Sequence, residues 1–398
     1  MSENVDWGAY ARNRATRYFD LYLAYAEAHE EPTTDNYAAL EAELPNIMNT
    51  VDGLVREEKW DAVSDLTQRV DDYLHIQGHW KKRVTTIEAG LVAARAVDHR
   101  RDEGEFLRHL GSVYRKLGQV EQAMTYGQQA LAVHREIGDH TGEGSALGGL
   151  GSVYHDLGQA EQAISLYEQA LDIAQENGNR REEGIWLGNL GNGYRDLGQL
   201  KRAIEFYQQS LLISREIGDR RGEGTDLSNL GSAYHTQGQH ERAIDCYQQA
   251  LPIALEVGNR PGEGTLLGNL GNIYSYFGQV TRAIKLYSRA LEIAREIGDQ
   301  RSEGAHLAHL GLASHELGQL EQAIGFYQQA LVIARENGYQ RDEAVWLGNL
   351  GSTYQSLGQI EQAMRFFEKS LAIFKAIKSP NAELTLAWLR RLKRAQSG

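Results

Sequence analysis

The side chains best suited to chemistry in this sequence are a few histidines and one cysteine. His306 and His309 stand three residues apart, so on a helix both imidazoles would lie on one face, at a spacing that a metal ion can bridge. No carboxylate or cysteine completes that pair into a metal site. His134 and His315 begin the segments HREIG and HELGQ, which both lack the second histidine of a zinc-protease helix. Cys246 stands in IDCYQQ without an evident base beside it, and we interpret it as a packing residue.

A glycine-rich run, GEGSALGGLG at 142–151, is the remaining segment that could hold a phosphate group. It lies on a segment with helical periodicity, which makes it a poor phosphate cradle. The nucleotide-binding pattern GxxxxGK[ST], whose amides and lysine hold phosphates, occurs nowhere in the sequence. The sequence therefore predicts a protein that is not an enzyme and that uses no cofactor and no metal.

Charge and composition exclude several other classes of function. The formal net charge of −13 argues against a general affinity for nucleic acid, because proteins that bind it usually carry a basic patch. No stretch approaches the roughly 18 apolar residues of a membrane-spanning helix, so no membrane association is expected. The single cysteine and the opening MSENVDWGAY, which lacks the features of a secretory signal, predict a cytoplasmic protein.

A repeat with a period of 40 residues is the strongest pattern in the chain. One column of the repeat holds tyrosine in every unit except the sixth, where Ser314 replaces it. Two further columns hold glycine and alanine without exception. The glycine column contains Gly118, Gly158, Gly198, Gly238, Gly278, Gly318 and Gly358. Such regularity predicts stacked copies of one structural unit, each of which contacts only its neighbours.

Each unit has the pattern of a helical hairpin. Between residues 182 and 219, apolar residues follow spacings of three and four in two successive runs, and each run predicts one helix. Gly198 separates the runs, where a left-handed glycine would end the first helix. Asp219 follows the second run and is of a type that caps the next helix. The fold class predicted is all-α, a solenoid of antiparallel helix pairs.

The expected organisation has four segments. Residues 1–57 form an N-terminal helical segment, with helices at about 7–30 and 36–56, and Pro45 is expected to begin a fresh helical turn. Residues 58–99 form a divergent helix pair, residues 100–379 form seven units of 40 residues, and residues 380–398 form a capping helix.

The segments GNLGNGYRDLGQ at 188–199 and RAIEFYQQSLLISREIGDR at 202–220 resemble the 40-residue class of tetratricopeptide repeat (TPR). The resemblance covers residues 100–379 and, more weakly, 58–99. These repeats are similar to those of Pins-type scaffolds and kinesin light chains, which bind peptides. The segment at 37–63, with GHW at 78–80, is similar to the linker before the TPR sensor of bacterial STAND-type signalling ATPases. The resemblance implies a right-handed superhelix that binds a protein or peptide ligand on its concave face. It implies a sensor or regulatory arm, and the alternative is a scaffold that joins two partners.

In the TPR fold the first helix of each hairpin lines the concave face, which identifies candidate contact residues. An asparagine amide can donate to and accept from a peptide backbone at once. One asparagine column recurs, although hydrogen bonds between hairpins could equally explain it. The candidate contacts away from the basic end are Asn189, Asn192, Arg195, Asn229, Asn269, Asn272, Tyr276 and Asn349.

The charge along this stripe is uneven. Arg108, Arg115 and Lys116 oppose only Glu105 in the first full unit, so an acidic segment of the partner is expected at this end. A recurring glutamate at the start of each first helix is interpreted as a charge favoured by the helix dipole. That column contains Glu103, Glu143, Glu183, Glu223, Glu263, Glu303 and Glu343. The sequence does not indicate the oligomeric state.

Overall fold

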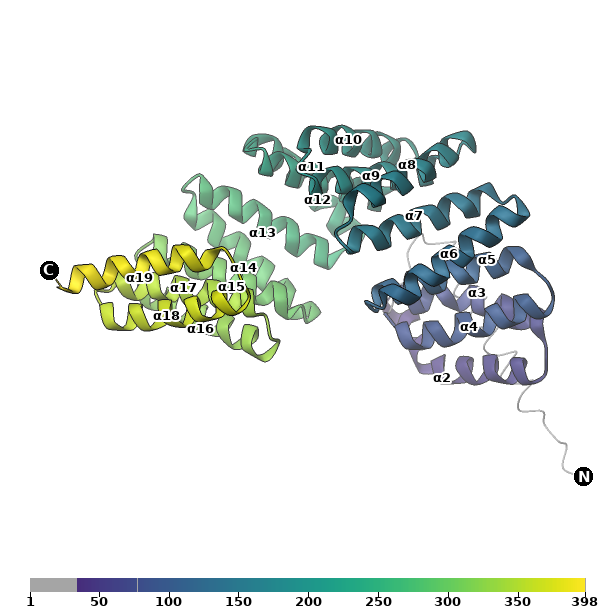
Figure 1. The fold of residues 1–398 in the computed structure, drawn as a ribbon, viewed down its shortest axis with the longest axis horizontal. Helices are drawn as coiled ribbons and strands as arrows, with labels where there is room; N and C mark the ends of the chain where they lie inside the picture. The colour runs from purple at the N-terminus through teal and green to yellow at the C-terminus, as the bar shows by residue number, and fades with distance from the viewer. Residues whose placement is uncertain (1–33, 77, 398) are drawn as a thin grey trace, which may run out of the picture. The chain divides into compact units, whose positions relative to one another are not determined.

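The computed structural model describes residues 34–76 and 78–397, and these residues form helices joined by short turns (Figure 1). The predicted all-α solenoid of antiparallel helix pairs is confirmed for this part of the chain. The helices are α2 (Thr34–Arg56), α3 (Trp60–Ile76), α4 (Trp80–Ala96), α5 (Arg100–Lys116), α6 (Val120–Ile137), α7 (His140–Asp156), α8 (Ala160–Glu176), α9 (Arg180–Asp196), α10 (Leu200–Glu216), α11 (Arg220–Thr236), α12 (His240–Glu256), α13 (Arg260–Tyr276), α14 (Val280–Ile297), α15 (Gln300–Glu316), α16 (Leu320–Glu336), α17 (Gln340–Ser356), α18 (Ile360–Ala376) and α19 (Asn381–Ser397).

The chain divides into two compact units, Met1–Ile213 and Ser214–Gly398. The boundary falls within α10. Each unit is built from the same hairpins, so the features of one hairpin explain the fold of both. No helix in the described part of the chain is long and apolar enough to cross a membrane.

Glycines in the left-handed conformation end the first helices, as the repeat predicts. Gly198 has a φ of 72°, a conformation that other residues adopt only at a cost in energy. Its amide donates to the carbonyl of Arg195 at 2.9 Å, and the amide of Gln199 donates to that of Tyr194 at 2.8 Å. These bonds satisfy carbonyls that the end of a helix would otherwise leave unpaired, so the chain reverses within three residues.

The expected N-caps of the first helices are present. The carboxylate of Asp219 accepts from the amide of Gly222 at 2.8 Å, which satisfies one of the free amides at the start of α11. Tyr339, which interrupts this column, makes no side-chain bond at the start of α17. The same capping bond is made by Asp139, Asn179, Asn259 and Asp299.

A glycine of the first helix and an aromatic ring of the second form the contact inside the hairpins from α7–α8 to α17–α18. In α9, a Cβ added to Gly191 would lie 2.5 Å from the ring of Tyr207, so only glycine allows this approach. Both Leu190 and Tyr207 are fully buried beside it. The same contact recurs as Gly151 with Tyr167, Gly231 with Tyr247, Gly271 with Tyr287, Gly311 with Tyr327 and Gly351 with Phe367.

The N-terminal segment differs from one expectation. Pro45 lies inside α2 and does not begin a helix. Leu44, Ile47 and Val51 form one buried face that continues past the proline, and this packing compensates for the backbone hydrogen bond that proline cannot donate. The helix expected at about 7–30 lies outside the described residues.

Candidate functional site

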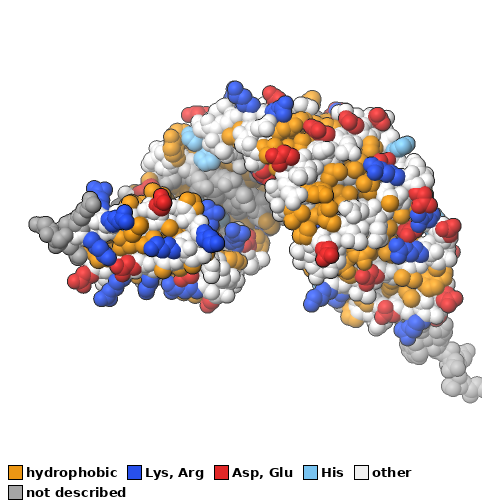
Figure 2. Space-filling model, in the orientation of Figure 1, with side chains coloured by type: hydrophobic (Ala, Val, Ile, Leu, Met, Phe, Trp, Pro, Cys, Tyr) orange, Lys and Arg blue, Asp and Glu red, His pale blue; other side chains and the backbone are white. Residues whose placement is uncertain are grey.

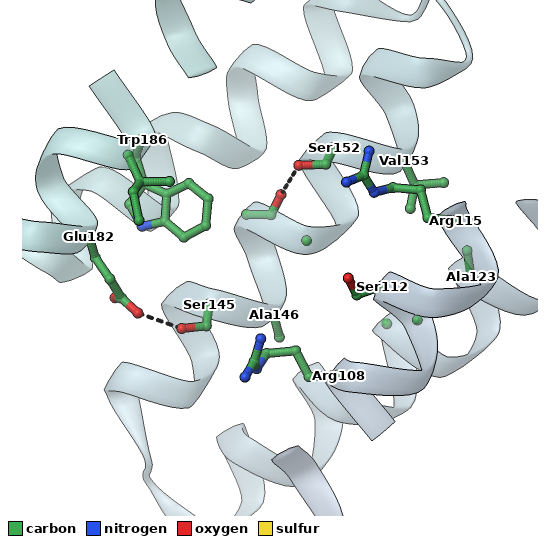
Figure 3. Close-up of a pocket in the computed structure, with 15 residues that line it drawn as sticks. Arg108, Ser112, Arg115, Ala123, Ser145, Ala146, Ser152, Val153, Glu182 and Trp186 are labelled. Carbon is green, nitrogen blue, oxygen red and sulfur yellow. Dashed lines mark hydrogen bonds between the residues drawn. The ribbon is translucent and has the colours of Figure 1, made fainter. Parts of the chain in front are cut away.

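A pocket of about 270 Å³ lies in the N-terminal unit, on the side of α5, α7 and α9 (Figure 3). We call this side the first-helix face, because these are the first helices of their hairpins. Two of the predicted contact residues, Arg108 and Arg115, line the pocket. Its other lining residues are Gly111, Ser112, Ala123, Gly127, Ser145, Ala146, Gly148, Gly149, Ser152, Val153, Glu182, Ile185 and Trp186.

The pocket exists because one hairpin lacks its aromatic ring. At position 127, α6 carries glycine where the later hairpins carry tyrosine or phenylalanine. Consequently the atoms nearest to a Cβ added to Gly111 are backbone atoms of Ala123 and Gly127, where the later hairpins place a ring. The neighbouring Tyr126 does not fill the space, since it stacks on Tyr114 with a centroid distance of 5.4 Å.

The next hairpins form the opposite wall of the pocket. The indole of Trp186 stacks on Tyr167, with a centroid distance of 6.3 Å, and lies so close to Gly148 that a Cβ there would clash with it. Trp186 is only 8% exposed, and its buried Nε1 has no hydrogen-bond partner among the described residues. Below it, the hydroxyl of Ser145 donates to Glu182 at 2.6 Å (Figure 3). Figure 2 shows hydrophobic side chains gathered on the surface over α7 to α9.

The three basic residues differ in their surroundings. Arg108 donates twice to Glu105, at 2.9 and 2.7 Å, and Arg115 forms an ion pair with Asp156 at 2.8 Å. Burial tends to raise the pKa of Glu105. The positive charge of Arg108 and its hydrogen bonds to Glu105 act in the opposite direction, and the net effect is a lowered pKa. Lys116 is exposed and forms no ion pair with any described residue. Two arginines thus line the pocket, each already paired with a protein carboxylate, and Glu182 is the acidic residue of the same lining.

The predicted asparagines fall into two groups. Asn192 and Asn272 accept hydrogen bonds from the hydroxyls of Tyr207 and Tyr287, both at 2.8 Å, and so help to hold their own hairpins together. The side chains in the other column are partly buried and make no hydrogen bond with the described residues. The hydrogen bond between hairpins that could have explained this column is therefore not seen in the described part. This second group contains Asn189, Asn229, Asn269 and Asn349.

The predicted residues are divided between the two units. Asn189, Asn192 and Arg195 lie on α9 in the N-terminal unit, and Arg195 contacts Asp196 of the same helix at 3.2 Å. Ile185 lines the pocket and stands one turn before Asn189, so the asparagine continues the same helix face. The others belong to the C-terminal unit, on α11, α13 and α17, and they are Asn229, Asn269, Asn272, Tyr276 and Asn349.

Tyr276 lies in an aromatic cluster of the C-terminal unit. It is 70% exposed, and its ring lies 4.4 Å from that of His240 and 5.6 Å from that of Phe277. His235 approaches His240, with 3.1 Å between their Nδ1 atoms, and burial, together with the nearby charge of His240, lowers the pKa of His235. A separate pocket of about 110 Å³ in this unit contains none of the predicted residues.

The glutamate column has a structural role that goes beyond the helix dipole. Glu223 accepts from Arg215, eight residues earlier, at 2.8 Å, and from Arg220, three residues earlier, at 2.5 Å. Glu223 therefore ties the start of a first helix to the end of the preceding second helix, whereas Glu263 pairs with Arg260 and Arg289. Equivalent contacts to the preceding helix are made by Glu103, Glu143, Glu183, Glu303 and Glu343.

The hairpin geometry, the glycine turns and the capping residues define a helical repeat protein of the solenoid class. The profile described as "Tetratricopeptide repeat" matches residues 102–176, 182–256, 227–296, 262–336 and 300–376. The chain belongs to the tetratricopeptide repeat family. The matching profile describes a repeat and no catalytic domain.

Solved structures share this fold at low sequence identity. A STAND protein with a tetratricopeptide repeat sensor from Pyrococcus horikoshii is 16% identical, with a TM-score of 0.66, and the match covers 84% of this chain and 50% of that one. The chain thus spans half the length of that protein. Aspartyl phosphate phosphatase F from Bacillus subtilis is 15% identical, with a TM-score of 0.56 and coverages of 82% and 92%. A Rap protein complexed with competence and sporulation factor is 16% identical, with a TM-score of 0.53 and coverages of 85% and 99%. No curated protein matches the chain.

Proposed function

We propose that this protein is a non-catalytic module that binds a protein or peptide on its first-helix face and acts as a sensor or regulatory arm of a signalling system. The observation that carries the proposal is the juxtaposition on that face of the pocket and the uncommitted amide of Asn189. An amide that the fold does not use can bind the backbone of an extended peptide, and a pocket can select one of its side chains.

The similar structures support this class of function. One is described as a STAND protein with a repeat sensor, another as a Rap protein in complex with competence and sporulation factor, and a third as a Rap regulator in complex with the Phr* peptide. The state of the cysteine agrees with a non-catalytic role. Burial raises the pKa of the Cys246 thiol to about 11, so the thiol is protonated at neutral pH and is a poor nucleophile.

A scaffold that joins two partners is the second candidate. It is favoured by the presence of a pocket in both compact units, of about 270 Å³ in the N-terminal unit and about 110 Å³ in the C-terminal unit. A scaffold holds both partners at once, whereas a sensor binds one ligand. Sedimentation of the purified protein with its captured partners distinguishes the two by the mass of the complex.

The partner is expected to present an acidic segment to Arg108, Arg115 and Lys116. The test is to immobilise the protein, capture proteins from lysate and compare it with a variant in which all three residues are replaced by glutamate. A partner lost from the variant, with a reduced salt dependence of the residual binding, supports the proposal. Equal capture by both proteins, at an unchanged melting temperature of the variant, would move the binding site away from this end.

A further inference from the structure

We propose that the pocket at Gly127 receives the side chain of a tyrosine from the partner, with acidic residues on either side of it in the partner's sequence. This inference rests on the proposed function and specifies its ligand. The proposal follows from what occupies the same position in the other hairpins, from one unused hydroxyl in the pocket, and from the charges at its mouth.

The shape of the pocket is that of a missing aromatic ring. In the following hairpins the ring at this position, such as that of Tyr167 or Tyr207, packs directly against a glycine of the first helix. Gly111 and Gly127 keep the same backbone framework without the ring. Pockets for drug-sized ligands usually measure about 300–1,000 Å³, so a volume of about 270 Å³ suits a single large side chain. Ala146 leaves further room, because the same column holds tryptophan at position 186.

The polar group that a tyrosine would need is also present. In three of the later hairpins the tyrosine hydroxyl donates to the residue one position after the glycine: from Tyr167 to Ser152 at 3.3 Å, from Tyr207 to Asn192 at 2.8 Å, and from Tyr287 to Asn272 at 2.8 Å. Ser112 holds this position in the pocket, and its hydroxyl has no hydrogen-bond partner among the described residues. A phenol hydroxyl from a ligand would therefore find the acceptor that the chain's own tyrosines use.

The wall formed by Trp186 adds a second recognition element. The indole of Trp186 lines the pocket, so an aromatic surface already borders it. Tyr167 of the following hairpin stacks on the same indole. The Nε1 atom of Trp186 lacks a partner in the described part of the chain, although it is buried. An aromatic guest is favoured over an aliphatic one by such a wall, because ring pairs gain more than their buried area alone.

The charges at the mouth select the neighbours of the tyrosine. Arg108 and Arg115 extend from α5 on two sides of the pocket (Figure 3). Their present partners, Glu105 and Asp156, are held by ion pairs near the surface, which are weak enough to be exchanged for carboxylates of a ligand. The pocket thus fits a tyrosine with Asp or Glu beside it.

The experiment measures the affinity of three blocked peptides, acetyl-Glu-Asp-Tyr-Asp-Glu-amide and its versions with phenylalanine or alanine at the centre, for the full chain. We expect the tyrosine peptide to bind about tenfold more tightly than the alanine peptide, with the phenylalanine peptide in between. Replacing Gly127 by tyrosine supplies the missing ring from the chain itself and should weaken tyrosine-peptide binding by about tenfold or more. Ser112→Ala, which removes only the hydroxyl, should bring the tyrosine and phenylalanine peptides to equal affinity.

A matched control separates the pocket from a general effect of tyrosine on a helix. Gly325→Tyr introduces the same change on α16, where an added Cβ meets no atom within 4 Å, and it should leave peptide affinity unchanged. Circular dichroism and melting curves of each variant establish that it is folded. If Gly127→Tyr does not fold, Ser112→Ala and the peptide series carry the test.

Several results would overturn the proposal. They are equal affinity of the tyrosine and alanine peptides, unchanged binding to folded Gly127→Tyr, and binding of 4-ethylphenol as tight as that of the peptide. The third result would assign the pocket to a small phenol. A dimer that Gly127→Tyr abolishes would assign it to a second copy of the chain. In each case the proposed function stands if the charge-reversed variant still loses its captured partner, and it fails separately if that partner is retained.

Discussion

Gly127 is the residue at which the repeat departs most informatively from its own pattern. It lies inside α6, where glycine costs roughly 0.5–1 kcal/mol relative to alanine, and it leaves a pocket where related hairpins bury a ring. A protein under selection for stability alone would be expected to carry the ring. The missing ring at position 127 therefore indicates a functional role for the pocket.

Gly127→Tyr should stabilise the protein by about 1–3 kcal/mol, from restored helix propensity and a buried ring. The gain is limited because the new Cβ would lie 2.8 Å from a terminal methyl of Leu150, which must move. Urea unfolding measures the change, and Gly325→Tyr gives the contribution of helix propensity alone. A destabilised Gly127→Tyr variant would show that the pocket does not have the shape of a tyrosine.

Asp71 forms the most deeply buried ion pair described in the chain. Its carboxylate accepts from Arg83 at 2.6 and 2.7 Å, and both side chains are less than a tenth exposed. Asp71→Asn should destabilise the protein by about 3–5 kcal/mol, because it leaves a buried guanidinium without its counter-ion. Asp65→Asn is the control. Asp65 pairs with Arg69 near the surface, so its replacement should cost at most about 1 kcal/mol. Equal unfolding energies for the two variants would contradict this assignment.

The same carboxylate predicts a response to acid. Burial tends to raise the pKa of Asp71, but hydrogen bonds from Arg83 and His109 outweigh it and hold the pKa well below the ordinary value. The folded protein therefore takes up this proton less readily than the unfolded chain does. The stability that Asp71 contributes is complete above the ordinary aspartate pKa of about 4 and is lost as the pH falls below it.

The buried imidazole of His309 predicts that protein stability also depends on pH in a range above that of Asp71. Burial, and then the neighbouring His306, lower the pKa of His309 to about 4, so the imidazole is neutral in the folded protein. Because the ordinary value is about 6.5, the unfolded chain binds the proton first, and the contribution to stability falls as the pH drops from 6.5 towards 4. His309→Asn, the residue found at Asn269 and Asn349, should reduce this slope. Urea unfolding at pH 7.5 and 5 measures it, and exposed His140→Asn should leave it unchanged.

At the scale of the helix, the N-caps of equivalent first helices can be compared with one another. Tyr339 begins α17 without a side-chain bond, whereas Asp299 caps α15 through the amide of Ser302 at 3.0 Å. Tyr339→Asp should therefore stabilise the protein by about 0.5–2 kcal/mol. Tyr339→Ala isolates the effect of losing the tyrosine. Thermal unfolding in which Tyr339→Asp melts at no higher temperature than Tyr339→Ala would show that a side-chain cap does not stabilise α17.

Much of the fold could be predicted from the sequence, because the residues that set it act locally. Gly198 ends a helix and Asp219 begins one through bonds to amides and carbonyls within a few residues, so their types alone identify the turns. Pro45 was placed wrongly, because the buried face of α2 that overrides it depends on packing against other helices.

The candidate site was harder to predict, because its features arise between helices. The pairing of Arg115 with Asp156 joins α5 to α7, and the wall formed by Trp186 reaches from α9 to Gly148 of α7. Neither contact has a signature in the spacing of one helix. The glycine at position 127 is visible as a break in the tyrosine and phenylalanine column, however, and comparison of the columns for missing bulk would have identified the pocket.

For the whole molecule, the repeat predicts an uninterrupted array, whereas the structure divides into two compact units with the boundary inside α10. The period reports only contacts between neighbouring hairpins and carries no information on larger units. The division of the chain into segments 1–57, 58–99, 100–379 and 380–398 stays a prediction. Each unit carries some of the candidate contacts, so binding can be tested in each separately.

The most direct test of the central claim, that the first-helix face binds a peptide or protein, is site-specific photocrosslinking. A benzoylphenylalanine is placed at Asn189 on α9 and, as a control, at Leu212, which is 67% exposed on α10 of the same hairpin. The account predicts that a partner in lysate is crosslinked from position 189 and not from position 212, and that Gly127→Tyr reduces this product. Crosslinking from position 212 alone would contradict it and would assign binding to the second helices.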